Sequence, residues 1–169
     1  MKRSNPAGLR PTLDRVRESI FNILTHRNLI QYERVRVLDL FSGTGAFGFE
    51  ALSRGVDCVC FVENQKSSLK ILRENAARLE TEVRVKIIDG DATKLGRNDA
   101  DRYDLIFLDP PYGKHLGELA LGSALKGGWI SDTAIVIWEE KVDIFPPKGF
   151  IVTEKRIIGK INVNFLIRE

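Results

Sequence analysis

The feature that most constrains the fold is a regular alternation of short apolar segments with helical patterns. The apolar segments predict strands at residues 35–39, 57–63, 83–88, 103–109 and 134–138. Helices are expected between them, at 46–54, 65–80 and 115–126. Strands that alternate with helices form a parallel, doubly wound α/β sheet with helices on both faces. Ligands of such sheets bind beyond the carboxyl ends of the strands.

Two flanking segments add to this sheet. Thr12 is expected to be the N-cap of an amphipathic helix that carries a stripe of apolar residues (Leu13, Val16, Ile20, Phe21, Ile23 and Leu24). After a turn at 146–149, strands at 150–158 and 161–167 predict an antiparallel hairpin at one edge of the sheet. The chain of 169 residues is then one domain, with a basic N-terminal helix segment (1–33), a cofactor-binding core (34–140) and a C-terminal hairpin (141–169).

Composition excludes several classes of protein. No apolar run is long enough to cross a bilayer and no secretory leader is present, so we expect a cytoplasmic protein. Cys58 and Cys60 lie two apart on a predicted strand and share one face, which favours core thiols over a mutual disulfide. With only His26 and His115 as further soft ligands, we expect no metal site.

A glycine-rich turn follows the first predicted strand. Asp39-Leu40-Phe41-Ser42-Gly43-Thr44-Gly45 leads into an apolar helix, and glycines allow the backbone to approach a ligand closely. Acidic residues also follow the next two strands, Glu63 at the distance typical of a ribose-binding carboxylate and Asp91 where it could accept from an adenine amine. The predicted cofactor-binding residues are Asp39, Phe41, Gly43, Gly45, Glu63, Asn64, Asp91 and Ala92.

Two cofactors fit this turn. Residues 43–48 also match the dinucleotide pattern G-x-G-x-x-G, in which the turn holds a pyrophosphate at a helix N-terminus. That interpretation needs a separate substrate domain, for which the chain has no room. S-adenosylmethionine carries no phosphate, and Asp39, Glu63 and Asp91 could meet its ammonium, ribose and adenine groups. Three acidic strand ends favour S-adenosylmethionine.

Asp109-Pro110-Pro111-Tyr112 follows the fourth predicted strand. The prolines make a stiff corner that offers hydrogen-bond acceptors and almost no donors. The Asp109 carboxylate and the Pro110 carbonyl could accept both hydrogens of a nucleobase amine, while Tyr112 stacks on the ring. We therefore predict Asp109, Pro110 and Tyr112 as catalytic residues. The alternative is that the prolines merely end a strand and Asp109 caps the next segment.

The N-terminal part of the chain is basic. Residues 1–36 contain eight basic and three acidic residues, a balance of +5, so the remainder carries −2 of the total charge of +3. This suits a phosphate backbone, although a solvated helix face explains it equally well. The predicted substrate-binding residues are Arg10, Arg15, Arg17, Pro111 and Lys114.

Three motifs in chain order resemble the bacterial 16S ribosomal RNA guanine-N2 methyltransferases of the small ribosomal subunit. They are Arg10-Pro11-Thr12 with residues 14–18, the glycine turn continued through residues 50–55, and Asp109-Pro110-Pro111-Tyr112. The resemblance extends to residues 154–156 and Gly159. It implies a class I methyltransferase (Rossmann-like) fold, S-adenosylmethionine as donor, and as partner 16S ribosomal RNA or the assembling small subunit. Members of that family usually begin with a basic β-hairpin, whereas here only Met1 to Ala7 precede the stretch, from Gly8 onward, that the resemblance covers.

Three functional hypotheses remain open from the residues. The first is an RNA methyltransferase acting as a monomer on the N2 amine of a guanine. The second is an S-adenosylmethionine-dependent N-methyltransferase that acts on adenine in nucleic acid, or on a small-molecule or protein amine. The third is a non-enzymatic RNA-binding module, in which Asp109 and the glycine turn would be idle.

Overall fold

A single seven-stranded sheet organises the protein. The computed structural model describes residues 10–169, with side chains from Asp14 onward. The strand order across the sheet is β3-β2-β1-β4-β5-β7-β6. In chain order the strands are β1 (Arg36–Leu40), β2 (Cys58–Glu63), β3 (Val85–Asp89), β4 (Tyr103–Leu108), β5 (Ile130–Glu140), β6 (Phe150–Ile158) and β7 (Ile161–Arg168).

The pairing confirms the predicted topology. Strands β1 to β5 are parallel, with β1 lying between β2 and β4. β7 runs antiparallel to β5, and β6 antiparallel to β7, so the predicted hairpin completes one edge. Strand order reverses at β1, which makes the carboxyl ends of β1 and β4 the expected ligand edge.

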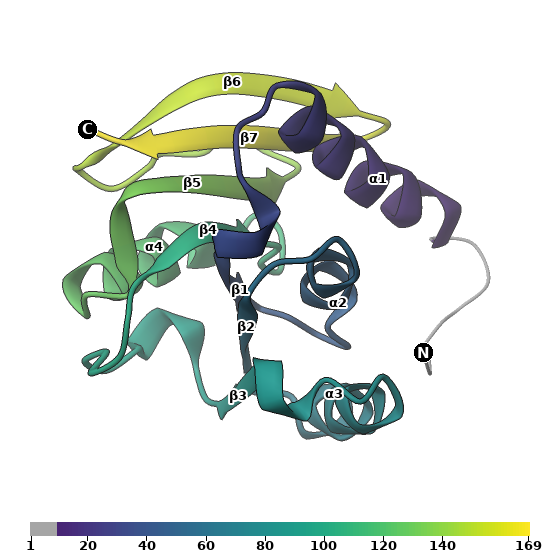
Figure 1. Ribbon diagram of the computed structural model, residues 1–169. Helices are drawn as coiled ribbons and strands as arrows, with labels where there is room; N and C mark the ends of the chain where they lie inside the picture. Colours follow the sequence, from purple (N-terminus) through teal and green to yellow (C-terminus); the bar gives the residue numbers. More distant parts are fainter. Residues whose placement is uncertain (1–9) are drawn as a thin grey trace.

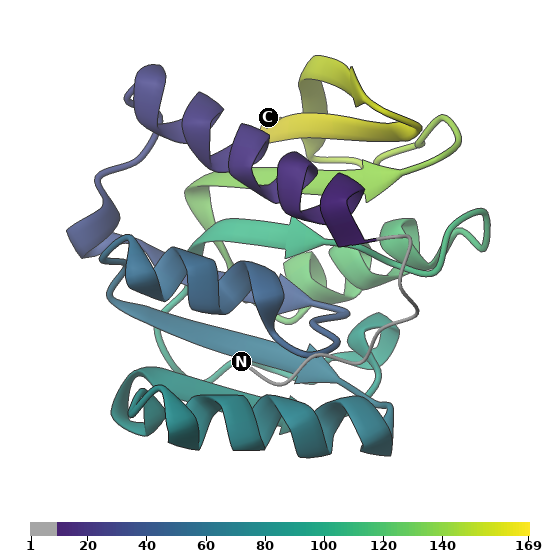
Figure 2. The ribbon, with the colours of Figure 1, turned by 90° about the vertical axis from the view of Figure 1, so that its right-hand side faces the viewer.

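Helices cover both faces of the sheet (Figure 1). The helices α1 (Arg10–His26), α2 (Ala46–Ser53) and α3 (Lys66–Arg78) lie on one face, as Figure 2 shows, and α4 (Leu116–Lys126) lies on the other. Successive residues of β1 alternate between two cores, because Val37 packs with α1, α2 and α3 whereas Leu38 packs with α4. Short 3₁₀ turns lie at η1 (Tyr32–Arg34), η2 (Glu82–Arg84) and η3 (Ala92–Lys94).

Most elements begin or end within one or two residues of the predicted positions, and two boundaries differ in a way that has a structural explanation. The helix α1 begins at Arg10, so Thr12 lies in its first turn and is not the N-cap. Pro11 is tolerated there because the first turn leaves its amide positions unpaired in any case. β5 begins at Ile130, earlier than predicted, because Ile130 pairs with Tyr103 across a register shift and the polar residues 131–133 hide the strand pattern.

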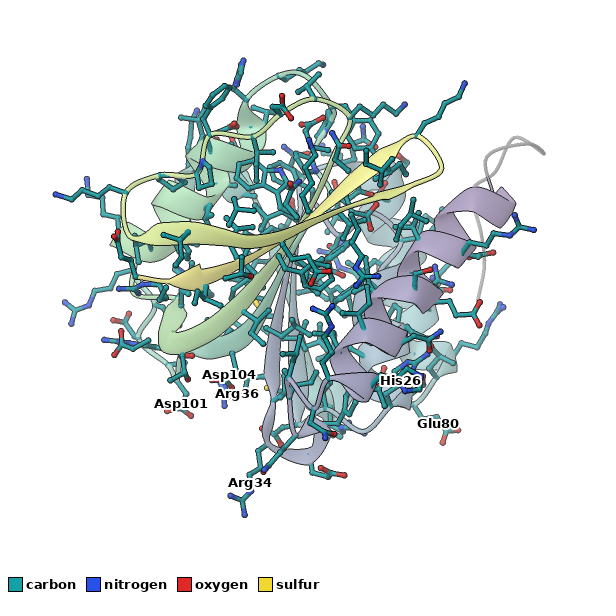
Figure 3. The ribbon with its side chains drawn as sticks, turned by 90° about the horizontal axis from the view of Figure 1, so that it is seen from above. His26, Arg34, Arg36, Glu80, Asp101 and Asp104 are labelled. Carbon is teal, nitrogen blue, oxygen red and sulfur yellow. The ribbon has the colours of Figure 1, made fainter. Side chains whose placement is uncertain are left out.

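Ion pairs tie the amino-terminal edge of the sheet together. The Arg36 amide donates to Asp104 (3.2 Å), and its guanidinium pairs with Asp101 (3.2 Å). Figure 3 shows both aspartates beside Arg36 at this edge, with Arg34 nearby. These two arginines therefore lie opposite the strand ends where a ligand is expected, although both count toward the basic N-terminal part of the chain.

Two further predictions concern the state of the two cysteines and the presence of a helix that could cross a membrane. Cys58 and Cys60 are free thiols, and burial raises the pKa of Cys60 to about 11. No helix within residues 10–169 has the length and apolar character needed to span a membrane.

Candidate active site

A crevice of about 370 Å³ opens at the carboxyl ends of β1, β2 and β4. It brings the glycine turn and the Asp-Pro-Pro-Tyr corner into one site, as the motif spacing predicts. Its lining residues are Phe41, Gly43, Glu63, Asn64, Gln65, Ser68, Asp109, Pro110, Pro111 and Tyr112. Among these described residues two are carboxylates and none is basic, so the crevice suits a cation better than a pyrophosphate.

The glycine turn owes its shape to left-handed backbone. Phe41, Gly43 and Gly45 have φ values of 61°, 54° and 82°. This conformation strains a bulky residue such as Phe41, and strain of this kind is concentrated at functional sites. A Cβ on Gly43 would meet no atom within 4 Å, whereas one on Gly48 would overlap the Phe61 ring. Gly43 therefore leaves the crevice wall open, and Gly48 lets α2 pack closely on β2.

Glu63 fixes the two loops that form one wall of the crevice. Its carboxylate accepts hydrogen bonds from the backbone amides of Gly43 (2.7 Å), Asn64 (2.8 Å) and Gln65 (2.7 Å). These three amides belong to the loops after β1 and β2. The carboxylate thereby fixes both loops in position and remains at the crevice surface.

Asp39 lies beneath the glycine turn and does not line the crevice. One carboxylate oxygen accepts from the Gly48 amide (3.1 Å) in the first turn of α2, and the other has no partner among the described residues. Burial raises the pKa of Asp39 well above its usual range. Because a carboxyl group already occupies the N-terminus of α2, this helix has no free anion site for a pyrophosphate.

Asp91 lies beyond β3 and is partly exposed. Its carboxylate accepts hydrogen bonds from the Thr93 hydroxyl (2.7 Å) and amide (2.9 Å). These two bonds cap η3 and lower the pKa of Asp91. Neither Asp91 nor the buried Ala92 lines the crevice described above. The side chain of Asp91 retains a second oxygen that could accept a hydrogen bond.

Asp109 and Tyr112 are in direct contact. The Tyr112 hydroxyl hydrogen-bonds the Asp109 carboxylate, and the Lys141 ammonium lies 4.7 Å from the centre of the Tyr112 ring. Burial raises the pKa of Asp109 to about 6; the Tyr112 bond and Lys141 oppose this rise, and Glu140 adds to it. Lys141 covers one side of the ring, so a stacking base would take the opposite side.

Glu139 and Glu140 are site residues that the sequence analysis missed. Glu140 accepts from the amides of Gly113 (3.2 Å) and Lys141 (2.8 Å), so it connects the Asp-Pro-Pro-Tyr loop to the end of β5. Glu139 lines a second cavity of about 100 Å³, which Asp109 also lines. Both residues end an apolar strand, as Glu63 does. The expectation that acidic residues at the ends of parallel strands belong to the ligand site would therefore have predicted them as well.

The predicted substrate-binding residues are dispersed. Arg17 of α1 lines the second cavity and pairs with Asp14 (2.9 Å). Arg15 is exposed on α1, and Lys114 is exposed in the loop after Tyr112, outside both cavities. Pro111 lines the crevice, whereas the side chain of Arg10 lies outside the described residues. Within residues 10–169, no cluster of three or more His, Cys, Asp or Glu residues could hold a metal ion.

Comparison with solved structures identifies the fold as that of methyltransferases. A putative methyltransferase from Escherichia coli, yhhF, superposes with a TM-score of 0.81 at 29% identity, over 99% of this chain and 92% of that one. The magnesium protoporphyrin IX methyltransferase of Synechocystis, solved with bound S-adenosylmethionine, superposes with a TM-score of 0.77 at 12% identity and shows the fold alone. The chain therefore has the class I methyltransferase fold.

Sequence relatives agree with the motifs. Ribosomal RNA small subunit methyltransferase D of Haemophilus influenzae is 29% identical over 94% of this chain and 82% of its own length. A putative rRNA methyltransferase of Bacillus subtilis, YlbH, is 38% identical over 91% of this chain and 85% of its own length. The family described as Conserved hypothetical protein 95 matches residues 1–167. The chain belongs to this family, which confirms the resemblance to the small-subunit ribosomal RNA methyltransferases.

Proposed function

We propose that this protein methylates the N2 amine of a guanine in 16S ribosomal RNA, with S-adenosylmethionine as the methyl donor. The observation that carries the proposal is the shared crevice: Asp109 and Pro110 line the same 370 Å³ space as the glycine turn. The names of the relatives, which are ribosomal RNA small subunit methyltransferases, support the class of substrate.

The crevice fits the proposed cofactor. Its described lining combines Glu63 and Asp109 with no basic side chain, and the unpartnered oxygen of Asp39 lies beneath the turn. Glu63 would hold the ribose hydroxyls, Asp91 and Ala92 the adenine, and Phe41, Gly43, Gly45 and Asn64 the remaining surface. When bound, S-adenosylmethionine supplies a methyl group on a positively charged sulfur, which a crevice without basic side chains accommodates better than a phosphate-binding site would.

Asp109 and Pro110 would hold the target amine. The ionised Asp109 carboxylate accepts one N–H and the Pro110 carbonyl accepts the other, so the nitrogen lone pair turns away from the ring and toward the crevice. The amine becomes acidic once it carries the new methyl group, and the Asp109 carboxylate or a water molecule takes the released proton. Tyr112 and Pro111 pack against the target base, while Arg15, Arg17 and Lys114 contact the phosphates of the RNA strand.

Methyl transfer by Asp109 variants tests the proposal. Small ribosomal subunits, or RNA, from cells that lack the protein are incubated with radiolabelled S-adenosylmethionine, and the product nucleoside is identified by mass spectrometry. We expect N2-methylguanosine, and we expect Asp109→Ala to slow its formation by about 10²- to 10⁴-fold while calorimetry shows nearly unchanged cofactor affinity.

Asp89→Ala is the matched control. Asp89 also ends a parallel strand, but it is exposed and lines neither cavity, so this variant should keep the wild-type rate. Methylation at the wild-type rate by Asp109→Ala would refute the role of Asp109. A product other than N2-methylguanosine would refute the choice of guanine, and N6-methyladenosine would favour the adenine alternative.

A further inference from the structure

A second cavity adjoins Asp109, which also lines the crevice described above. The small cavity of about 100 Å³ is otherwise lined by Arg17 of α1, Ala46 and Phe47 of α2, Phe107 of β4 and Glu139 of β5. The rings of Phe47 and Phe107, which stack on each other with their centres 3.8 Å apart, form the apolar part of the cavity wall. Such a space suits the edge of a planar ring.

Glu139 brings a second carboxyl group into this cavity, beside Asp109. Its side chain is buried, with only 4% of the residue exposed, and its pKa responds to the charges of Asp109 and Arg17. Buried polar groups in proteins are nearly always hydrogen-bonded. A ligand edge that enters the cavity would therefore have to offer Glu139 a matching pattern of donors and acceptors.

The protonation of the two carboxyl groups differs. Burial raises the pKa of Glu139 to about 9, with the neighbouring Asp109 charge adding to the rise, Arg17 opposing it and Asp39 contributing least. The pKa of Asp109 reaches only about 6. Burial raises both pKa values, and the charge of Asp109 disfavours a second charge on Glu139, so the pair binds a proton at pH values where an isolated carboxyl group is ionised; Glu139, with the higher pKa, favours the proton. A neutral carboxyl group presents one acceptor and one O–H donor side by side.

Guanine carries the complementary pattern beside its N2 amine. The neighbouring N1–H is a donor, and O6 next to it is an acceptor. We propose that Glu139 recognises this edge of the target guanine, its carbonyl oxygen accepting from N1–H and its hydroxyl donating to O6, while Asp109 holds the adjacent amine. Adenine is disfavoured because the ring edge beside its amine offers the N1 acceptor alone, so it forms one hydrogen bond with a neutral carboxyl group where guanine forms two. This inference rests on the proposed function and makes Glu139 a specificity-determining residue.

Base discrimination by Glu139 variants tests the inference. Two synthetic RNA fragments are compared, one with the mapped guanine and one with 2-aminopurine, which keeps the amine but lacks N1–H and O6. We expect the wild type to prefer guanine strongly. Glu139→Ala should lower kcat/KM for guanine by about 10²-fold, through the loss of two hydrogen bonds, and leave 2-aminopurine nearly unaffected. Glu139→Gln, which retains an adjacent acceptor and donor, should restore most of the rate and the preference.

The outcomes separate the inference from the proposed function. If the wild-type protein forms no N2-methylguanosine, the proposed function fails. If it does, but Glu139→Ala keeps the wild-type kcat/KM or the wild-type preference for guanine, the inference fails and the proposed function stands. Asp89→Asn is the control, since it also removes a strand-end carboxylate and lines neither cavity. Equal affinity of all variants for S-adenosylmethionine, measured by calorimetry, shows that the fold is intact.

Discussion

Individual carboxyl groups set the stability of this protein as a function of pH. Burial raises the pKa of Asp39, Asp109 and Glu139 above their values in an unfolded chain. The folded state therefore binds more protons than the unfolded state over this range, and the free energy of unfolding falls as pH rises. For Glu139 the window extends from its ordinary pKa of 4.5 to about 9.

Removal of the ionisable group at residue 139 should stabilise the protein at alkaline pH. We expect Glu139→Gln to raise Tm at pH 8, by about 2–4 °C for each kcal/mol gained, and to have little effect near pH 4.5, where the carboxyl group is neutral in both states. Thermal unfolding followed by circular dichroism measures both values. Glu33→Gln, at an exposed carboxylate, should leave Tm unchanged at each pH. An equal gain at both pH values would contradict the explanation.

Lys141 should determine the pH at which the rate of methyl transfer begins to rise. Its ammonium lowers the pKa of Asp109, which is about 6 in the intact protein. We expect methyl transfer to increase as pH rises through about 6, because Asp109 must be ionised, and we expect Lys141→Ala to move this midpoint to higher pH. Lys141→Arg retains the charge and should keep the midpoint. Rate profiles from pH 5 to 8 decide the matter, and an unchanged midpoint in Lys141→Ala would rule out the role of Lys141.

At the scale of secondary-structure elements, the sequence predicted the strands and their parallel or antiparallel direction better than their ends. Apolar runs such as 103–109 are bounded by clear turn residues, whereas β5 begins in a polar segment whose strand geometry depends on pairing with Tyr103. The contacts of Glu139 and Glu140 depend on that extended strand. The left-handed Phe41 also gives no sequence signal, because the surrounding loop imposes this conformation.

Two glycines of α4 provide a matched test of packing between this helix and the sheet. A Cβ on Gly117 would overlap the Trp138 ring of β5, whereas a Cβ on Gly122 would meet no atom within 4 Å. We expect Gly117→Ala to destabilise the protein by about 1–3 kcal/mol through overpacking. Gly122→Ala should stabilise it by about 0.5–1 kcal/mol, since alanine favours the helix. Urea denaturation measures both, and a stable Gly117→Ala variant would show that α4 can move away from Trp138.

At the scale of the whole molecule, two pairs of arginines from the basic N-terminal part of the chain lie at different ends of the strands. Arg34 and Arg36 lie at the amino-terminal edge of the sheet, and Arg36 is paired with Asp101 (Figure 3). Arg15 and Arg17 lie on α1, and Arg17 reaches the cavity beside Asp109. Charge counted along the sequence could not separate these groups, because the topology places them at different ends of the strands.

Arg15 should therefore contribute to RNA binding through charge alone. We expect Arg15→Ala to weaken binding of 16S RNA and to reduce the slope of log K against log salt concentration by about 0.7–0.9, the value for one lost phosphate contact. Filter binding at several salt concentrations measures the slope. Arg97→Ala, at an exposed arginine paired with Asp99 outside both cavities, serves as the control. Equal salt slopes for Arg15→Ala and Arg97→Ala would show that the RNA does not contact Arg15.

The carboxyl group that Asp39 places at the start of α2 has a consequence for competition inside a cell. Adenosine di- and triphosphates share the adenine and ribose of the proposed cofactor, but their phosphate chains would find the Gly48 amide already bonded to a carboxyl group where other nucleotide-binding folds offer free amides. The feature that anchors the helix therefore also withholds the contacts through which those metabolites would compete with the cofactor.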